Sequence, residues 1–557
     1  MDRSMKLNTL SAALLCALPM TGAFAAALDR SGQSISSFLQ PNNYFEVGVS
    51  ALMPEVTGKE NDANIGNDRK IDNMAKDYVF ANAAVKLQFN DKFSFGLIFD
   101  QPFGASAAYG GNNFFVAGQG INGSDSVLPI ATLGALAQQK IEEGTNDTVN
   151  ALFSDTTLPA GHPLAQKQME VRAGIQQQTN GAIQKFAHEN LNGDVAQAQA
   201  MYDNNIAPAP GGPGLADIIN PAVQTGVKAV VTPGVEAEVK KQVEAGLQAV
   251  NGTLGGSGGG TNVSVTTENI SMLFGYSPID RVTVYAGPVY QNVKGHVSLR
   301  GDVYSLYNGY DLDIDDVGGM GWIAGAAYQI PEIALKASLT YRSEIDHKAK
   351  AGDTTETISA ISALALLDPE NGAAIANDIV NSKGKTTITT PQSVNLDLQS
   401  GIMADTVAFA NIRWVNWKDF AIRPHQFGLL SNVVGQLPQI NRPNGFNLVE
   451  YSEDQWSVTA GVGRKFSEKW AGNVSVGWDS GAGNPVSTLG PTDGFYNVGL
   501  GVQFSPAANY FVAGGVKYLW LGDADAQTGA DAGTNVSKAK FEDNNAVAVG
   551  LKMGYRF

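Results

Sequence analysis

Histidine, serine and acidic side chains are the residues with which this chain could perform catalysis or bind a metal. No Gly-x-Ser-x-Gly motif places a serine nucleophile. His296 and Ser298 would share one face of a strand, but such a pair is common by chance. The histidines are scattered without metal-site spacing, at His162, His188, His296, His347 and His425. The sequence therefore predicts no enzyme, no cofactor and no metal site.

The composition excludes several further classes of protein. The 557 residues include 37 Lys and Arg against 53 Asp and Glu, for a formal net charge of −16, and only 16% of residues are charged. An acidic chain lacks the basic surface with which proteins bind nucleic acid. The hydrophobic fraction, 43%, is too high for a disordered chain. With 63 Gly and so little charge, the chain is also unusual for a cytoplasmic enzyme.

Residues 1–25 have the pattern of a secretory signal peptide. Two basic residues precede an apolar stretch at 10–20, and Ala-Phe-Ala at 23–25 supplies the small residues that signal peptidase accepts. We expect cleavage after this motif, which also removes the single cysteine, Cys16. The mature chain is then expected to contain no disulfide and no cysteine ligand.

Segments with two different faces follow the signal. None has the roughly 18 uncharged apolar residues that a membrane helix requires. In the last segment, Leu551 and Met553 point to one face of a strand and Lys552 to the other. Such a strand is typical of a membrane barrel with lipid outside and a polar lumen. We count fourteen strands, near 43–55, 78–89, 92–103, 262–276, 281–297, 318–329, 333–347, 385–401, 406–417, 452–466, 469–480, 493–505, 508–521 and 541–557.

Short and long connections alternate between these strands. Outer-membrane barrels have short periplasmic turns, long outer loops and both termini in the periplasm, whereas a soluble β-sandwich has no reason to alternate. The sequence therefore predicts an all-β fold, a transmembrane antiparallel β-barrel of 14 strands in the outer membrane of a Gram-negative bacterium. The tight turns are expected at 90–91, 277–280, 330–332, 403–405, 467–468 and 505–508.

One connection, 104–260, is far longer than the others and lies on the outer face of the predicted topology. Helices are expected in it at 163–189 and at 235–250, where apolar residues recur every four positions. A glycine-rich return ends at Gly260. This extracellular helical insertion could collect greasy ligands, or it could pack only on itself as a surface loop. The predicted domains are a signal peptide at 1–25, an N-terminal hatch at 26–42, strands 1–3 at 43–103, the insertion at 104–260 and strands 4–14 at 261–557.

Short motifs, in order along these strands, resemble the long-chain fatty acid transport (FadL-type) family of outer-membrane channels. They are Tyr341-Arg342-Ser343-Glu344, the stretch 414–420 with its end Trp417-Lys418-Asp419-Phe420, the strand from Trp470 toward Pro485, and Asp493-Gly494-Phe495. The resemblance covers most of the chain outside the insertion. It implies a monomeric barrel plugged by an N-terminal hatch, with an outer hydrophobic groove, an inner pocket for the acyl chain and a lateral opening toward the bilayer.

The front of the chain departs from the family pattern. The hatch is shorter than usual and lacks the Asn-Pro-Ala element often found there, for which Pro41-Asn42-Asn43 is the nearest match. Either a minimal plug folds into the lumen, or the insertion does part of the plugging. The residues expected in a minimal plug are Leu28, Ile35, Phe38 and Leu39.

Strand parity gives a set of candidate ligand-binding residues in the lumen. A cation there could meet the carboxylate of an amphiphile whose tail leaves water for an apolar pocket. Each cation could instead pair with an inward acid such as Glu344 or be solvated. Gly96 and Gly104 are candidates for a weakened strand that forms the lateral exit. The lumen candidates are Lys336, Arg342, Glu344, Phe511, Lys517, Lys552 and Arg556.

The acidic run Asp311, Asp313, Asp315 and Asp316 could bind calcium. It lacks the turn glycine and terminal Glu of a helix-loop-helix calcium site. We therefore expect a solvated loop, or one that divalent ions bridge to lipopolysaccharide phosphates.

These observations predict passive uptake of hydrophobic small molecules, with long-chain fatty acids as the expected substrate. Outer-membrane lipid and lipopolysaccharide are the expected surroundings of a monomer. The alternatives are a general diffusion porin for polar solutes, an aromatic hydrocarbon channel of the same fold, and an adhesive role for the insertion. Inward Phe511 and Leu519 favour a plugged or greasy lumen over a wide polar bore.

Overall fold

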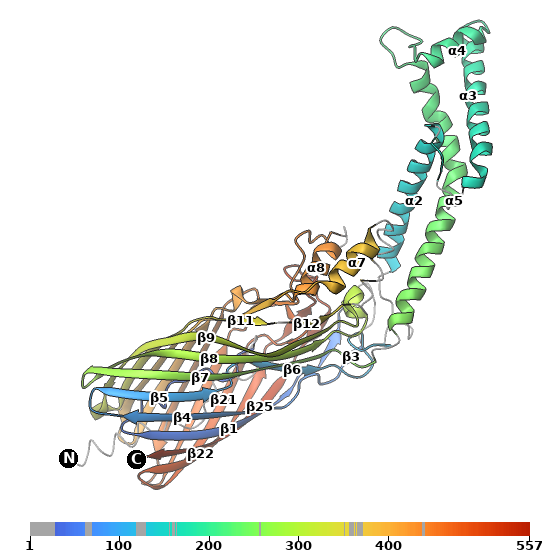
Figure 1. Ribbon diagram of the computed structural model, residues 1–557. Helices are drawn as coiled ribbons and strands as arrows, with labels where there is room; N and C mark the ends of the chain where they lie inside the picture. The colour runs from blue at the N-terminus through green and yellow to red at the C-terminus, as the bar shows by residue number, and fades with distance from the viewer. Residues whose placement is uncertain are drawn as a thin grey trace. The chain divides into compact units, whose positions relative to one another are not determined.

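Fourteen antiparallel strands form a closed ring in the computed structural model (Figure 1). Each strand pairs with the next along the chain, and β1 pairs with β25 to close the ring. The predicted fold class is therefore confirmed. In ring order the strands are β1 (Tyr44–Glu55), β4 (Tyr78–Gln88), β5 (Phe93–Asp100), β7 (Asn262–Ile279), β8 (Val282–Ser298), β9 (Asp311–Ile330), β10 (Leu335–Arg342), β14 (Ser393–Met403), β15 (Thr406–Val415), β18 (Gln455–Lys465), β19 (Trp470–Asp479), β21 (Phe495–Ala507), β22 (Tyr510–Leu521) and β25 (Asn545–Arg556).

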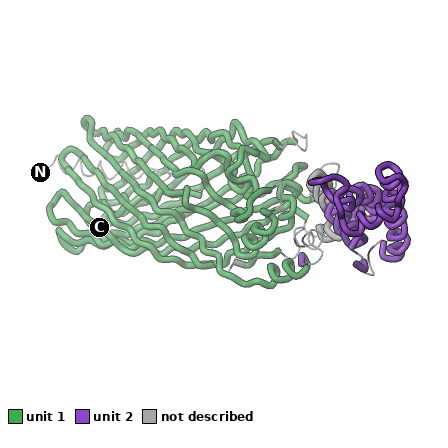
Figure 2. The backbone as a smooth tube through the Cα atoms, turned by 90° about the horizontal axis from the view of Figure 1, so that it is seen from above, with its two compact units in different colours: residues 1–127, 253–361, 373–557 green, residues 128–252, 362–372 purple. Residues whose placement is uncertain are grey.

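The chain divides into two compact units, shown in green and purple in Figure 2. The barrel unit comprises residues 1–127, 253–361 and 373–557, and the helical unit comprises residues 128–252 and 362–372. The predicted signal peptide and the start of the hatch lie outside the described residues. The structure describes residues 28–61, 69–118, 130–154, 156–158, 164–254, 258–349, 351–355, 371–436 and 440–557, with the single residues 162, 361 and 364.

The two faces of the barrel strands differ as their period-two pattern predicts. In β25, Leu551 is 56% exposed and Met553 is 49% exposed, whereas Lys552 between them is 3% exposed. The outer face of a membrane barrel meets lipid, so its exposed apolar side chains leave water without packing on protein. The short connections between barrel strands lie at the predicted turns.

Several predicted strands have different bounds; the one predicted at 92–103 ends at Asp100, and three others differ more. β9 begins at Asp311, so the acidic run is part of a strand and is not a loop, because β8 and β12 (Ala351–Thr354) pair with it on both sides. The segment predicted at 333–347 divides into β10 and β11 (Ile345–Ala349). The segment predicted at 385–401 divides into β13 (Thr386–Thr390) and β14, with Pro391 between them. Proline has no N–H to donate to a strand ladder, which accounts for this second break.

β11 and β13 form a separate two-stranded sheet, and β11 lies against the inner face of β9. Ile345 of β11 packs close to Gly319 and Gly321 of β9. A Cβ atom at either glycine would collide with the Ile345 side chain, so these positions require the smallest residue. Ile345 is thereby buried against the inner face of the barrel wall.

Shorter elements occupy the connections of the barrel unit. A five-stranded sheet in the order β20, β23, β24, β2 and β3 joins three of these connections. The remaining elements are β2 (Gly58–Glu60), β3 (Lys70–Ile71), β6 (Gly104–Ala108), η3 (Asp302–Tyr307), η4 (Pro331–Ile333), α7 (Gly372–Asn381), η5 (Trp417–Asp419), β16 (Ala421–Ile422), α8 (His425–Val434), β17 (Val449–Glu450), β20 (Val486–Ser487), β23 (Ala524–Gln527) and β24 (Ala539–Phe541).

The helical unit has a core of its own. It contains α2 (Ile130–Phe153), η2 (Ala165–Lys167), α3 (Gln168–Asn190), α4 (Val195–Asp203) and α5 (Leu215–Leu254). Val223, Val227, Val231 and Val235 of α5 recur every four residues and are buried with side chains of the other helices. The prediction of helices at 163–189 and 235–250 missed α2, α4 and the first half of α5, which contains Pro221 and Pro233.

The boundaries of the insertion also differ from the prediction of 104–260. Residues 104–108 form β6, which pairs with β7 and belongs to the barrel unit. The residues of β6 are all small, and they adopt the extended conformation because β7 pairs with them. No helix among the described residues is long and apolar enough to cross a membrane.

Candidate functional site

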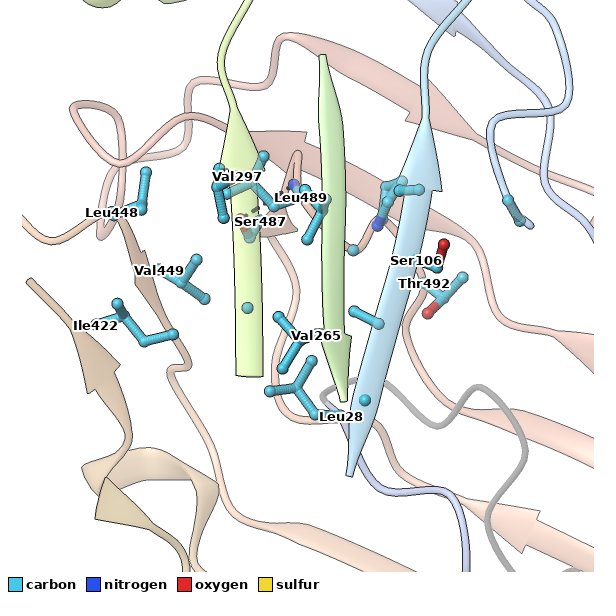
Figure 3. Close-up of a pocket in the computed structure, with 18 of the residues that line it drawn as sticks. Leu28, Ser106, Val265, Val297, Ile422, Leu448, Val449, Ser487, Leu489 and Thr492 are labelled. Carbon is cyan, nitrogen blue, oxygen red and sulfur yellow. Dashed lines mark hydrogen bonds between the residues drawn. The ribbon is translucent and has the colours of Figure 1, made fainter. Parts of the chain in front are cut away.

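An apolar cavity lies in the barrel unit between the hatch, four barrel strands and the outer connections (Figure 3). Its empty volume is about 970 Å³, counting the space that is open to solvent. The lining is mostly aliphatic and includes Leu28, Val56, Val263, Val265, Val297, Leu312, Ile314, Ile422, Leu448, Val449, Leu489 and Pro491.

The period-two pattern of the strands supplies the apolar wall of this cavity. Val263 and Val265 of β7 point inward beside Val297 of β8, and Leu312 and Ile314 of β9 follow. Valine and isoleucine pack well on a pleated surface, so the residues that favour the strands also make the wall apolar. The upper lumen can therefore remove a hydrocarbon tail from water.

The hatch is tied to the barrel wall by buried polar contacts. Arg413 Nε of β15 donates to Asp29 Oδ2 at 2.7 Å, and both side chains are at most 3% exposed. Arg413 also donates to Gln33 Oε1 at 3.0 Å. Asn395 Nδ2 of β14 donates to the Gly32 carbonyl at 2.7 Å. Since buried charges require partners, these contacts hold the first hatch residues in one position.

The second part of the hatch is apolar and fills the lumen lower down. Ile35, Phe38 and Leu39, which the sequence predicts as plug residues, are buried in one cluster with inward residues of β5, β7, β8 and β9. The ring of Phe38 contacts that of Tyr285 at 5.7 Å. The fourth predicted plug residue, Leu28, lines the apolar cavity above. A short hatch therefore closes the cavity from below.

The third strand of the barrel is interrupted next to the hatch. The ladder between β4 and β5 ends at the pair Ala83 and Phe99, and pairing on this side resumes at the bridge between Ala75 and Ala107. Between these pairs, the side chain of Gln101 accepts from the Ala81 N–H at 3.2 Å in place of a strand. We call this interruption, bounded by residues 78–82 and 100–106, the wall window.

The hatch backbone occupies the inner side of the wall window. Arg30 N donates to the Pro102 carbonyl at 2.6 Å, and Gly104 N donates to the Leu28 carbonyl at 2.8 Å. A second cavity, of about 500 Å³ with the space open to solvent, lies between hatch serines and the window. Its lining includes Ser31, Phe80, Asn82 and Gln101. The hatch thus covers the inner side of the window, and Tyr78, Gly104 and Ser106 at the window's edges also line the apolar cavity.

Of the two glycines predicted at a lateral exit, only Gly104 lies at the window. At Gly96 the ladder is continuous, with Lys86 on one side and Leu273 on the other. Its missing side chain makes room for Phe38 of the hatch instead. Gly104 begins β6 directly after the interruption. A role in the lateral exit therefore stays a prediction for Gly104 and no longer for Gly96.

The predicted lumen residues occupy different environments. Lys552 Nζ lies 3.3 Å from Glu46 Oε1, and both side chains are buried. Arg342 is buried and donates to Ser271 Oγ and the Gln33 carbonyl, both at 3.1 Å. Lys336 and Lys517 also face inward, and Phe511 is 1% exposed. These five positions agree with strand parity.

Two further predicted lumen residues are less enclosed. Arg556 lies 5.8 Å above the ring of Tyr44 and 5.7 Å above that of Phe511. Glu344 is exposed, because β10 ends at Arg342 and the chain turns away before β11. Strand parity does not apply to Glu344, which lies between β10 and β11, so its place in the lumen and a pair with an inward cation stay predictions. Contact of any of these residues with ligand stays a prediction.

His296 and Ser298 do come together with acids, on the outer face of β8 and β9. His296 Nδ1 lies 2.7 Å from Asp313 Oδ1, and His296 Nε2 lies 3.0 Å from Ser298 Oγ. Ser298 Oγ donates its proton to Asp311 Oδ1 at 2.5 Å. Because the hydroxyl proton is committed to an acid rather than to the imidazole, this arrangement lacks the activated nucleophile of a hydrolase.

Sequence reasoning missed the residues that join hatch and wall. Arg413 has the inward parity of β15, so the rule that found Arg342 could have found it. Asp29 and Arg30 precede the first strand and have no periodic pattern that would assign them a side. Their roles depend on long-range contacts with β15, β6 and β4.

A lipid-facing barrel with a plugged lumen and an apolar cavity defines a transport channel of the outer membrane rather than an enzyme. The family model described as "Outer membrane protein transport protein (OMPP1/FadL/TodX)" matches residues 151–557. The chain therefore belongs to this family and resides in the outer membrane, as the resemblance of its motifs implies. Sequence comparison with curated proteins gives no significant match.

Solved structures of the family share little sequence with the chain. A FadL homologue of Pseudomonas aeruginosa has 10% identity and a TM-score of 0.52, with 99% of this chain and 98% of that chain covered. This likeness shows a shared fold. The toluene transporter TodX of P. putida has 10% identity and a TM-score of 0.45, with 94% and 91% covered. The toluene transporter TbuX of Ralstonia pickettii has 10% identity and a TM-score of 0.42, with 97% of each chain covered.

Proposed function

We propose that this protein is a passive channel for the uptake of long-chain fatty acids across the outer membrane, with a lateral exit through the wall window. The substrate first enters the apolar cavity from the outer side. It then passes the first hatch residues and leaves between β4 and the start of β6. Transport follows the concentration gradient, since a substrate that partitions into the bilayer needs no further driving force.

The arrangement of the apolar cavity above a plug and beside the wall window carries this proposal. The cavity accepts a hydrocarbon chain because its walls are aliphatic. The buried hatch cluster obstructs the direct route down the lumen. The break in the ladder is the place where the wall lacks strand pairing, and unpaired backbone at membrane depth is tolerated where protein covers it or a pathway opens.

Two alternatives make different demands on this lumen. A diffusion porin requires a continuous water-filled bore lined by polar side chains, whereas here the hatch packs against the wall with Ile35, Phe38 and Leu39. An aromatic hydrocarbon channel would use the same apolar cavity. It would need no partner for a carboxylate, so the two hydrophobic substrates are distinguished by the polar groups that line the path.

Binding and conductance measurements test the proposal together. The purified protein in detergent is titrated with oleate, and the same preparation is inserted into a planar bilayer. Saturable micromolar binding with little steady ion conductance is expected. Large stable conductance without acyl binding would overturn the proposal in favour of a porin.

A substitution beside the wall window tests the lateral exit. Asn82→Trp fills the second cavity but does not alter the lining of the apolar cavity. We expect oleate uptake by cells to fall several-fold while oleate affinity in detergent is retained. Ala286→Trp, on the exposed face of β8, is the matched control and should leave both unchanged. Normal uptake by the Asn82→Trp variant would exclude this exit.

A further inference from the structure

Arg30 is a buried cation at the point where the hatch meets both the apolar cavity and the wall window. The residue is 6% exposed and lines the apolar cavity. Its Nε donates to the Gly104 carbonyl at 2.8 Å, and its guanidinium carbon lies 3.7 Å above the ring of Tyr78. The planar group is therefore held in one orientation by β6 and β4.

The charge of Arg30 has no carboxylate partner among the described residues. The adjacent acid, Asp29, forms its ion pair with Arg413 instead. Arg30 Nη2 is buried and has no hydrogen-bond partner in the described part of the chain. Burial lowers the pKa of Arg30, while its interaction with Tyr78 acts in the opposite direction and favours the charged form. The stacking over Tyr78 compensates only part of the lost hydration.

The other cations that face the hatch are satisfied differently. Arg413 has Asp29, and Lys552 has Glu46. Arg342 donates to Ser271 of β7 and to the Gln33 carbonyl of the hatch. Its buried Nε also has no hydrogen-bond partner among the described residues, but Arg342 does not line the apolar cavity. Arg30 combines a buried donor that lacks a partner with a wall of aliphatic side chains. A carboxylate is the group that a guanidinium binds best, because its two oxygens match the fork of N–H donors.

We propose that Arg30 binds the carboxylate of an amphiphilic substrate whose hydrocarbon chain lies in the apolar cavity. This inference rests on the proposed function and assigns the head-group site within it. The site is made by the hatch and not by the inward cations of the strands. Since Arg30 lines the first cavity and Ser31 lines the second, the head group is recognised where the substrate turns from the cavity toward the wall window.

Gly104 is part of this site because of what it lacks. A Cβ atom at this position would overlap the guanidinium of Arg30. Any side chain here would displace the guanidinium from the Gly104 carbonyl and from the ring of Tyr78. Because Gly104 has no side chain, the guanidinium of Arg30 can occupy this position. A substitution of Gly104 would therefore move the proposed carboxylate site but keep the positive charge of Arg30.

Two ligands of equal chain length distinguish head-group binding from a structural role for Arg30. The full-length mature protein in detergent is titrated with oleate and with oleyl alcohol, which lacks the carboxylate. For Arg30→Gln we expect at least a tenfold loss of oleate affinity and less than a twofold change for oleyl alcohol. Arg464→Gln removes one charge at an exposed site of β18 and should change neither affinity.

Gly104→Ala supplies a second variant that keeps the arginine. It should lower oleate affinity several-fold and spare oleyl alcohol, as displacement of the guanidinium requires. Equal losses for both ligands in Arg30→Gln, or unchanged oleate affinity, would overturn the head-group assignment. If the Arg30→Gln variant binds oleate as tightly as the unmodified protein does, the head-group assignment fails and the proposed function stands. If the unmodified protein binds oleyl alcohol but not oleate, the assignment and the fatty-acid substrate both fail. If it binds neither ligand, the proposed function itself fails.

Discussion

The interiors of the two units are built on opposite principles. The lumen of the barrel unit buries charged and polar side chains, among them Asp29, Arg413 and Lys552. The core of the helical unit consists of aliphatic side chains such as Ile183, Leu215 and Val231, and no charged residue belongs to it among the described residues. The exteriors are reversed as well, with Leu500 of β21 57% exposed and Lys185 of α3 75% exposed at its side chain.

This difference reflects the surroundings of each unit, which are water for the helical unit and lipid for the outer face of the barrel. The helical unit gains stability by removing its apolar side chains from water into a close-packed core. The barrel unit gains it by moving apolar side chains into lipid, which leaves the lumen free for polar contacts with the hatch. A substitution should therefore have different effects at equal burial, depending on which interior it enters.

The largest effect is expected from breaking the buried pair between hatch and wall. Arg413→Met leaves Asp29 as an unpaired buried carboxylate, and the expected loss of stability is about 3–5 kcal/mol. The hatch should detach from β15, so ion conductance in a planar bilayer should rise. Urea unfolding of the barrel and conductance measure the two consequences.

A double variant separates the pair from its environment. Asp29→Asn together with Arg413→Met removes both charges and should recover much of the lost stability. An equal loss in the single and double variants would mean that the lumen tolerates an unpaired charge, and the contrast between the two interiors would then be weaker than described.

Replacement of one alanine by leucine in each unit should change stability by an intermediate amount, downward in the helical unit and not at all or slightly upward in the barrel unit. Ala187 of α3 is 0% exposed in the helical core, so Ala187→Leu overpacks it and should cost about 1–3 kcal/mol. Ala286 of β8 faces outward, where lipid yields to a larger side chain. Ala286→Leu should leave stability unchanged or slightly increase it. Circular dichroism of the helices during urea unfolding reports the stability of the helical unit, and heat resistance reports that of the barrel unit. Equal losses of stability in the two variants would contradict the contrast between the two interiors.

The smallest effect is a pH dependence that comes from Asp493 in the barrel unit. Burial, with the nearby charge of Glu453, raises the pKa of Asp493 in the loop before β21 to about 6. The folded state therefore binds this proton more tightly than the unfolded state, and stability should fall as pH rises from about 4 to about 6. The expected change is on the order of 1 kcal/mol after screening by solvent.

Asp493→Asn should remove this decrease, because an amide does not ionise. The urea midpoint of the barrel, measured at pH values on both sides of the window, gives the test. Asp405→Asn, at an exposed turn, is the matched control and should retain the pH dependence. Neither substitution should change the urea midpoint of the helical unit at a given pH. A decrease that persists in Asp493→Asn would assign it to another acid.

Much of the barrel could be predicted from sequence because each strand carries its own two-face pattern. Leu551, Met553 and Lys552 have the orientations that strand parity predicts. The tight turns followed from the same segments. The helices of the insertion were harder, because Pro221 and Pro233 interrupt the sequence pattern of α5 although the helix continues through them.

The parts that could not be predicted depend on contacts between distant segments. The acidic start of β9 reads as a loop by composition, yet pairing with β8 and β12 makes it a strand. β6 has only small residues and becomes a strand through β7. Strand parity placed Lys552 and Arg342 correctly, but it could not place Arg30, whose position is set by Gly104 and Tyr78.

The pairing of β1 with β25 imposes an order on biogenesis. These strands join from Tyr44 with Arg556 to Glu55 with Asn545, so the seam of the ring connects its first and last strands. The ring cannot close until the last strand has been synthesised and delivered to the membrane. The hatch directly precedes β1, and its side chains lie inside the finished ring. Insertion of the hatch must therefore accompany or precede closure of the seam. Pairing of β25 with β1 is then the step that encloses the hatch in the barrel.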